Sequence, residues 1–178
     1  MARGRSNTRT EITEVALELF ARNGYERTSL REISDRLNIT KAALYYYFPS
    51  KLDVLRALMQ PYTDDAETWL TAAESDQQMD RRDLVGGFYD LSVRHRKVLR
   101  AALADSGAME ALGVVEQVLS WRQRLHTLLI GPTPGPQAQA AAVIAVGGLL
   151  DCTMLLPEPA SEPYREAALQ AALRALDG

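Results

Sequence analysis

Residues 29–51 read SLREISDRLNITKAALYYYFPSK, and this stretch decides the fold. Ser29 is followed three residues later by Glu32, which is the pattern of a helix capping box, and apolar residues then recur at helical spacing. Thr40 can cap another helix that ends before Pro49, because a residue preceding proline disfavours the α conformation. Two short helices joined by a tight turn are therefore predicted, in the layout of a helix-turn-helix.

An amphipathic helix precedes this pair. Its apolar positions between Thr8 and Asn23 follow the spacing of one helix face, and Gly24 supplies a stop signal. The apolar residues on this face are Ile12, Val15, Ala16, Leu19 and Phe20. Three short helices in the first fifty residues can therefore share one small core, to which the second and third contribute Leu30, Ile33, Leu37, Ile39, Leu44 and Phe48.

The three consecutive tyrosines, residues 45–47, cannot all enter that core, because a buried helix face recurs every three or four residues. Packing of the apolar positions leaves Lys41, Ala42, Tyr45 and Tyr46 on the opposite face. Small side chains let a helix approach base edges, lysine can donate to guanine or phosphate, and tyrosine hydroxyls can donate to phosphate. We expect Tyr47 to pack against the small domain; the alternative is an aromatic helix face that only meets water.

The segment TEVALELFARNGYERTSLREISDRLNITKAALYYYFPSKLDVLRAL, residues 13–58, resembles the N-terminal DNA-binding domain of the tetracycline-repressor (TetR) family of bacterial regulators. The resemblance implies an all-α homodimer in which each subunit inserts its third helix into the major groove of a palindromic operator. Near the second helix it implies contacts to the DNA backbone or flanking bases, and at Lys51 a phosphate anchor. The implied DNA-binding residues are Thr28, Ser29, Arg31, Lys41, Ala42, Ala43, Tyr45, Tyr46 and Lys51.

The charge distribution agrees with a nucleic-acid partner for the N-terminal part. Residues 1–60 contain ten Lys or Arg and seven Asp or Glu, a net charge of +3, whereas residues 61–178 contain ten against sixteen, a net charge of −6. Such asymmetry is typical of a chain in which one part meets a polyanion, although chance can also produce it. The chain has 178 residues, of which 47% are hydrophobic, so it can bury an ordinary core.

Several other classes of protein are disfavoured. No apolar run approaches the roughly 20 residues of a membrane span, so we expect a soluble cytoplasmic protein without membrane contact. Cys152 is the single cysteine, and neither it nor the two histidines has the spacing of a metal site. Nucleophile and phosphate-binding glycine motifs are absent, which disfavours an enzyme, and no cofactor is expected.

The remainder of the chain is also expected to be helical. Further helices are predicted over residues 82–104, 114–130, 137–156 and 161–176. A fourth helix begins after Ser50, and Pro61 must kink or interrupt it. Pro61 is a candidate pivot between the two parts of the protein, or it simply marks a helix boundary.

The last two long helices are the predicted dimer interface. Residues 138–156, AQAAAVIAVGGLLDCTMLL, are apolar around the whole helix, with small residues at three- or four-residue spacing. With the helix at residues 161–176 they can form a four-helix bundle between two subunits. The alternative is that the first of these helices is the centre of one subunit.

The C-terminal part is further expected, by the family resemblance, to bind a small hydrophobic or aromatic effector. The candidate contacts combine aromatic and soft apolar walls with polar groups. They are Trp69, Phe88, Tyr89, His95, Met109, Trp121, Asp151 and Met154. Each can equally be a core residue, and Asp151 can equally lie at a subunit boundary.

The sequence thus predicts an all-α protein with a helix-turn-helix DNA-binding domain at residues 1–50 and a helical effector-binding and dimerisation domain at residues 51–178. The predicted function is ligand-responsive, sequence-specific transcriptional regulation, with repression as the expected sign. The alternatives are a DNA-binding dimer without effector control and a helical enzyme.

Overall fold

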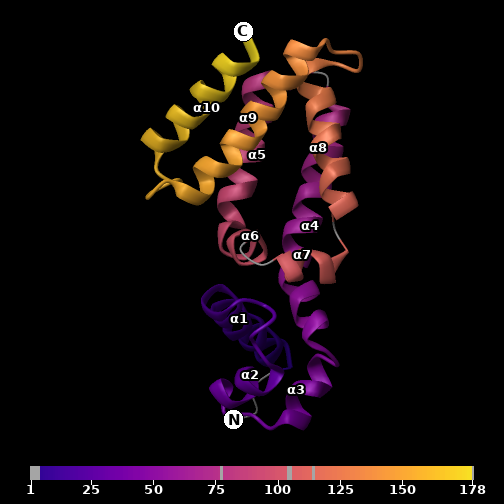
Figure 1. The fold of residues 1–178 in the computed structure, drawn as a ribbon, viewed down its shortest axis with the longest axis vertical. Helices are drawn as coiled ribbons and strands as arrows, with labels where there is room; N and C mark the ends of the chain where they lie inside the picture. The colour runs from indigo at the N-terminus through magenta and orange to yellow at the C-terminus, as the bar shows by residue number, and fades with distance from the viewer. Residues whose placement is uncertain (1–4, 77, 104–105, 114, 178) are drawn as a thin grey trace. The chain divides into compact units, whose positions relative to one another are not determined.

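The computed structural model describes residues 5–76, 78–103, 106–113 and 115–177, which form ten α-helices and no strand (Figure 1). The prediction of an all-α protein is therefore confirmed. The helices are α1 (Arg5–Asn23), α2 (Leu30–Leu37), α3 (Lys41–Tyr47), α4 (Lys51–Ser75), α5 (Arg81–Arg94), α6 (Arg96–Leu103), α7 (Ser106–Leu112), α8 (Val115–Ile130), α9 (Pro136–Leu155) and α10 (Glu162–Asp177).

The chain divides into two compact units. The first unit is Met1–Pro61 with Lys97–Val115, and the second is Tyr62–Arg96 with Glu116–Gly178. This division differs from the boundary expected at residue 50, because α6 and α7 belong with the N-terminal helices. Helix α4 contributes to both units and is not interrupted at Pro61, which is the last residue of the first unit's N-terminal segment.

The first unit forms around the apolar face of α1. Ile12 and Ala16 are fully buried there, and they share a core with Ile33 of α2 and Leu44 of α3. Helix α1 ends at Asn23. Gly24 follows with a φ of 86°, in the left-handed region that glycine adopts without steric cost, and its N–H donates to Phe20 O at 2.9 Å. The expected three-helix core is present.

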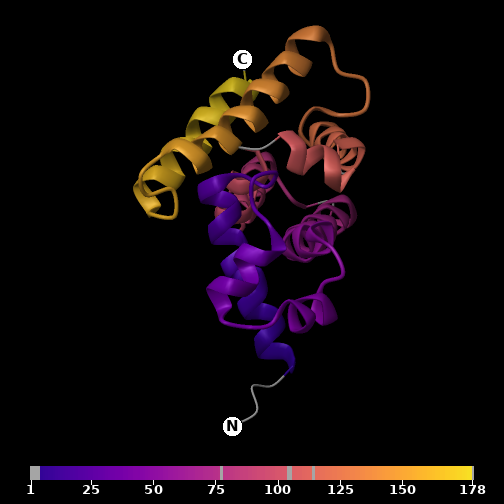
Figure 2. The ribbon, with the colours of Figure 1, turned by 60° about the horizontal axis from the view of Figure 1, so that its bottom comes forward.

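The second unit packs α9 and α10 side by side in opposite directions, with α5 beside both (Figures 1 and 2). Ala142 and Leu149 of α9 and Leu169 of α10 are buried in its core. Tyr89 of α5 is also fully buried, and its hydroxyl donates to Pro159 O at 2.9 Å, which satisfies the one polar atom of the side chain.

Some helix boundaries differ from those predicted. The single helix expected over residues 82–104 is two helices, because the chain leaves α-helical geometry at His95, whose N–H still donates to Leu91 O at 3.1 Å. The short helix α7 was not predicted. Helices α8, α9 and α10 begin and end within one residue of the predicted bounds.

Helix α9 is long and apolar enough, by length and composition, to cross a membrane. The expectation that no apolar segment approaches this length is therefore wrong. The physical reason for its apolar character lies in its neighbours: α9 packs on α10 and α5, so much of one face is core.

Candidate nucleic-acid interface

The capping box predicted at the start of α2 is present. The Ser29 N–H donates to Glu32 Oε2 at 2.7 Å, and the Glu32 N–H donates to Ser29 Oγ at 3.2 Å. The Ser29 N–H and the Ser29 hydroxyl, which donates to Glu32 Oε2 at 2.9 Å, lower the pKa of the Glu32 carboxyl, since they stabilise its ionised form. Such a cap contributes about 1 kcal/mol to helix stability, so α2 begins at a fixed residue.

The turn between α2 and α3 is tight and closed by backbone hydrogen bonds. Asn38 adopts φ 53° and ψ 44°, the left-handed conformation that asparagine tolerates better than most residues. The Ile39 N–H donates to Ser34 O at 3.1 Å. Thr40 then caps α3, since its hydroxyl oxygen accepts from the Ala43 N–H at 3.1 Å. The turn therefore fixes the direction of α3.

Helix α3 presents two different faces. Leu44 on α3 and Phe48 just after it are each 1% exposed and hold the helix in the core. Tyr45 is 51% exposed and Tyr46 is 67% exposed, and Lys41 and Ala42 are exposed beside them. The remaining predicted contact on α3, Ala43, is half-buried.

Tyr47 is half-buried, as expected from its packing side, and its ring meets the Tyr46 ring edge-on with centroids 5.3 Å apart. The three adjacent phenols thus divide into two outward side chains and one that leans on the small domain. The outward face combines a lysine, an alanine and two tyrosines, a set that can approach base edges and donate to phosphate oxygens.

Two residues predicted to contact DNA near α2 have different environments. Arg31 is exposed and lies 3.5 Å from Asp35 across one helical turn, an exposed ion pair that contributes little. Thr28 is only 2% exposed, and its hydroxyl donates to Gly24 O at 2.8 Å. This hydroxyl closes the loop between α1 and α2, and a DNA contact by Thr28 stays a prediction.

Lys51 also differs from a free phosphate anchor. Its ammonium donates to Tyr25 O at 2.8 Å and to Glu26 O at 3.2 Å, and it lies 4.2 Å from the centre of the Tyr25 ring. Two of its three N–H donors are thus used within the protein.

The short-range sequence patterns missed two cations of the first unit, Arg9 and Arg27. Arg9 donates to Tyr47 O at 3.2 Å and lies 4.3 Å above the Phe48 ring. Because Arg9 and Tyr47 are 38 residues apart, no local pattern signals this contact. Arg27 is exposed, and neither its side chain nor that of Lys41 has a hydrogen bond or ion pair with a described residue. The position of Arg27 beside Thr28 in a net-basic segment was a usable signal.

The predicted effector residues of the second unit are only partly brought together. The Trp121 and His95 rings both contact Tyr62, edge-on, at centroid distances of 5.9 and 5.6 Å. Tyr62 was not predicted, although its place beside Pro61 in an apolar helical pattern offered a signal. Burial raises the pKa of its phenol.

Carboxylates hold the polar atoms at both ends of this aromatic row, which we name the Trp121–Tyr62–His95 row. The indole N–H of Trp121 donates to Glu67 at 2.7 Å, and His95 Nε2 lies 2.8 Å from Asp65. Hydrogen bonds from these partners and from Arg124 or Arg94 lower the pKa of Glu67 and of Asp65.

Among the described residues, the other effector candidates make no ring contact with the row, although Tyr89, Trp69 and Phe88 belong to the same hydrophobic cluster. Tyr89 is a core residue, Trp69 and Phe88 are half-buried against the core, and Asp151 is exposed. Met154 is half-buried, and its carbonyl accepts from Arg96 at 3.0 Å. The side chain of Met109 lies outside the described residues.

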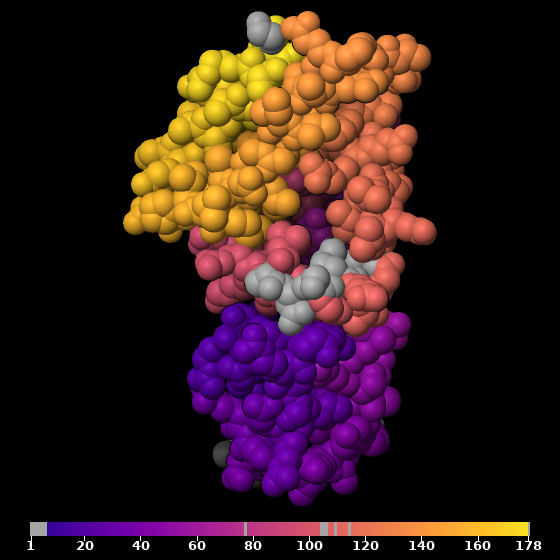
Figure 3. Space-filling model, viewed as in Figure 1, coloured from indigo at the N-terminus to yellow at the C-terminus, as the bar shows by residue number. Residues whose placement is uncertain are grey.

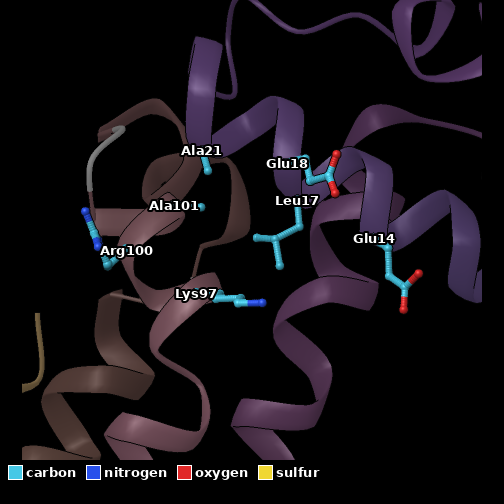
Figure 4. Close-up of a pocket in the computed structure, with 7 residues that line it drawn as sticks. All are labelled: Glu14, Leu17, Glu18, Ala21, Lys97, Arg100 and Ala101. Carbon is cyan, nitrogen blue, oxygen red and sulfur yellow. The ribbon is translucent and has the colours of Figure 1, made fainter. Parts of the chain in front are cut away.

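Two surface grooves occur within the described units. One, of about 560 Å³, lies between α1 and α6 in the first unit, with Glu14 and Glu18 on one side and Lys97 and Arg100 on the other (Figure 4). The other, of about 280 Å³, lies between α4 and α8 and includes Glu74 and Arg124. Neither groove is lined by a residue predicted to bind an effector. No group of three or more potential metal ligands occurs among the described residues.

The fold and this site define a class: an all-helical protein whose N-terminal helix-turn-helix exposes one face of a short helix. Residues 12–58 match the sequence profile of the family described as bacterial regulatory proteins, tetR family. These residues therefore form a helix-turn-helix domain of the TetR family. The matched residues include the helix-turn-helix, most of α1 and the beginning of α4.

The chain is similar to known regulators along part of their length. It is 34% identical over 110 residues to the HTH-type transcriptional regulator YuxN of Bacillus subtilis, covering 60% of this chain and 37% of that one. It is 33% identical over 133 residues to the probable acrEF/envCD operon repressor of Escherichia coli K12, covering 68% of this chain and 60% of that one. The match thus spans less than two thirds of either relative.

A solved structure extends the likeness to the whole fold. The TetR-like transcriptional regulator from Rhodococcus sp. RHA1 superimposes with a TM-score of 0.75, covering 99% of this chain and 100% of that one at 22% identity. At this identity the likeness concerns the fold alone, which includes the helices of the second unit.

Proposed function

We propose that this protein is a cytoplasmic, ligand-responsive repressor that binds a palindromic operator as a homodimer. The observation that carries the proposal is the outward face of α3, where Lys41, Ala42, Tyr45 and Tyr46 lie opposite the buried Leu44. A soluble protein gains nothing from two exposed phenols beside an unpaired lysine unless that face binds something. A polyanionic duplex satisfies the lysine, both hydroxyls and the flat aromatic edges together.

The proposed dimer uses α9 and α10. Only 28% of the most apolar part of α9 is buried within the chain, and Ile144 and Leu155 are 65% and 80% exposed. Figure 3 shows α9 and α10 forming one continuous surface of the second unit. A second copy of the same surface would remove these apolar side chains from water through a two-fold axis, and a two-fold axis is what a palindrome requires.

The proposed ligand response rests on the second unit. The Trp121–Tyr62–His95 row supplies aromatic faces with polar edges, a composition that suits an aromatic or hydrophobic effector. Tyr62 directly follows Pro61 on α4, whose N-terminal half lies in the DNA-reading unit. An effector that displaces Tyr62 would thus act on the helix that carries the reader, with Pro61 as the weak point in its hydrogen bonding. Repression follows the E. coli relative, whose name states that role.

The test begins with selection of duplexes from a random pool by the purified protein. We expect enrichment of one palindromic sequence, bound at least about a thousandfold more tightly than a shuffled duplex near physiological salt, as measured by fluorescence anisotropy. Light scattering at micromolar concentration should give the mass of a dimer. A monomeric mass, or a pool with no enriched sequence, would contradict the proposal.

Effector control is tested separately. Small aromatic and hydrophobic compounds would be screened for release of the selected duplex, with Tyr62→Leu as the variant that loses the response and Tyr164→Leu, a half-buried tyrosine of α10, as its matched control. A DNA-binding dimer that no compound releases would favour a regulator without effector control.

A further inference from the structure

Helix α8 carries two polar side chains that its core face does not explain. The residues that α8 buries in the core are Trp121, Leu125 and Leu129. Arg122 and His126 are four residues apart, so they lie on one face of the helix, next to the core face, and both are half-buried. A guanidinium and an imidazole are thus partly withdrawn from water at the same place.

The imidazole of His126 has an unsatisfied polar atom. Its Nε2 is buried and has no hydrogen-bond partner among the described residues. Burial and the positive charge of Arg122 lower the pKa of His126 from its ordinary value of 6.5, so the ring is neutral at pH 7. Buried polar atoms without a partner are rare in folded proteins, because their lost hydration is not replaced. A polar group of another molecule would satisfy this atom.

Arg122 extends from α8 to α9. Its Nη2 lies 3.8 Å from the position that a Cβ at Gly147 would occupy, so the guanidinium lies beside a residue of α9 that has no side chain. Arg122 makes no hydrogen bond or ion pair with a described residue, and neither does the exposed Asp151, one turn further along α9. The cation is therefore held between the two helices with its donors unused.

The nearby Arg124 provides a contrast on the same helix. Its guanidinium donates to Glu74 at 2.7 Å and to Glu67 at 2.8 Å, and these bonds raise its pKa. No described carboxylate does the same for Arg122. Because Glu67 and Glu74 are already bound to Arg124, a carboxylate for Arg122 would have to come from another molecule.

We infer that Arg122 and His126 bind the carboxylate of a small monoanionic effector between α8 and α9, where the surface of the second unit is hollowed (Figure 3). The planar fork of Arg122 can donate two parallel N–H bonds to one carboxylate, and His126 Nε2, when it carries the ring proton, can donate a third. Since the imidazole is neutral, the two side chains together carry one positive charge, which one carboxylate balances.

The apolar part of such an effector has neighbours in the same unit. Trp121, which belongs to the Trp121–Tyr62–His95 row, directly precedes Arg122 on α8. On α9, Val143 is 52% exposed and lies one turn before Gly147. The inference rests on the proposed ligand response and makes it more specific, because the effector class becomes a carboxylic acid with an aromatic or aliphatic body.

The first test compares acids with their amides by isothermal titration calorimetry on the full chain without DNA. The acids are phenylacetate, benzoate and octanoate, and each is paired with its primary amide, which has nearly the same shape but no charge. We expect at least one acid to bind about tenfold or more tightly than its amide, which is the scale of charge-assisted hydrogen bonds. Absence of binding by every acid, or equal binding of each acid and its amide, would overturn the inference.

Variants then assign the binding to the two side chains. Arg122→Met, which keeps an apolar stem, should weaken binding of the acid about tenfold or more, and His126→Phe should weaken it roughly two- to tenfold. Arg122→Lys keeps the charge but loses the fork, so its affinity should lie between those of the wild type and Arg122→Met; it replaces Arg122→Met if that variant does not fold.

Arg174→Met is the matched control, since Arg174 is an exposed arginine of α10, and it should bind the acid as tightly as the wild type. Full affinity in both Arg122 variants, or an equal loss in Arg174→Met, would contradict the assignment.

The carboxylate that meets Arg122 has a second possible source, Asp151 of the partner subunit. Light scattering distinguishes the two sources. We expect Arg122→Met to keep the mass of the wild type, whereas loss of the dimer in this variant, together with no binding of the acids, would assign the contact to the partner and overturn the inference.

The proposed function fails separately, if the wild type enriches no duplex from the pool, because binding of the acids is measured without DNA. If neutral compounds release the selected duplex and no acid binds, effector control stands and the carboxylate site is wrong.

Discussion

The two units of this protein hold their polar side chains in different ways. In the first unit, caps and turn bonds join residues three to five apart, such as Ser29 with Glu32 and Ile39 with Ser34. In the second unit, the indole of Trp121 reaches Glu67 and Arg165 reaches Asp90, pairs separated by 54 and 75 residues. The proposed DNA-reading helix thus takes its cap and its turn from local structure, with distant contacts only from Arg9 and Lys51, whereas the proposed sensing region depends on tertiary contacts.

The two units should therefore respond differently to amino-acid substitution. A surface defined by local structure can change its outward residues without disturbing the helix that carries them. A region defined by distant pairs changes its packing whenever one partner changes. In the first unit, a single substitution should therefore change either stability or binding. In the second unit, a single substitution should change both.

The largest expected effect is on stability, and it distinguishes Phe48 from Tyr46, which is only two positions away. Phe48→Ala removes a side chain that is 1% exposed, and a buried Phe→Ala substitution costs about 3–5 kcal/mol of stability. Tyr46→Ala removes a side chain that is 67% exposed and should change stability by less than about 0.5 kcal/mol.

Urea unfolding checks this prediction with two signals. Circular dichroism reports all helices, whereas fluorescence of Trp69 and Trp121 reports the second unit, where both lie. Phe48→Ala should lower the circular dichroism midpoint more than the fluorescence midpoint. Equal losses for Phe48→Ala and Tyr46→Ala would contradict the division of α3 into a packed and a free face.

A smaller effect is expected where α4 and α5 approach each other in the second unit. A Cβ added at Gly87 would lie 2.3 Å from Trp69 Nε1 and 2.8 Å from its Cε2, so the rigid indole must move. Gly87→Ala should therefore cost about 1–3 kcal/mol of stability through overpacking, measured by urea unfolding.

Gly147→Ala is the matched control, because the nearest side-chain atom to its added Cβ is 3.8 Å away, at the end of Arg122. It should gain up to about 1 kcal/mol, since alanine is favoured over glycine inside a helix. A neutral Gly87→Ala would show that the tryptophan can repack freely, and the contrast between the units would be weaker.

The features that could be predicted from the sequence are those that depend on residues close together in the chain. The capping box, the tight turn between the two short helices and the outward pair Tyr45 and Tyr46 follow from residue types within a few positions, and the structure has all of them. Periodicity also placed α8, α9 and α10. The contacts of Lys51 with the Tyr25 carbonyl could not be predicted, because an ammonium near the start of a helix fits a phosphate equally well until the tertiary fold is known.

In the second unit, sequence identified aromatic residues but not their neighbours. Trp121 and His95 were singled out as separate candidates, and it is Tyr62 of α4 that joins them. Asp151 was selected as an acid on an apolar helix, and its exposure removes the cost of burial that motivated the choice. The break at His95 was missed because apolar periodicity continues across α5 and α6.

Loss of one phenol hydroxyl on α3 should affect binding without affecting stability. A hydrogen bond contributes about 0.5–1.5 kcal/mol, and a dimer has two copies of each contact, so Tyr45→Phe should weaken operator binding by about 1–3 kcal/mol, or roughly 5- to 150-fold. Fluorescence anisotropy measures the affinity and urea unfolding the stability. Unchanged affinity in Tyr45→Phe would remove its hydroxyl from the interface and leave only the ring as a contact.

The smallest effect concerns pH and the Trp121–Glu67 bond. The indole N–H of Trp121, at 2.7 Å, and Arg124, at 2.8 Å, lower the pKa of Glu67 from its ordinary value of 4.5. Between the folded and unfolded pKa values the folded state binds fewer protons than the unfolded state, so stability rises with pH there. The contribution is therefore present above about pH 4.5 and is lost as the pH falls through the folded pKa.

Trp121→Phe removes the N–H donor and should cost about 1 kcal/mol more at pH 7 than at acid pH, where this cost falls as the Glu67 carboxyl becomes protonated. Part of the loss comes from the smaller ring and does not depend on pH. Trp69→Phe controls for that part, since it removes an indole that has no carboxylate partner among the described residues. Urea unfolding followed by circular dichroism gives both differences. If the two variants lose the same stability at both pH values, the Trp121–Glu67 bond does not stabilise the second unit, and packing alone holds the indole between α4 and α8.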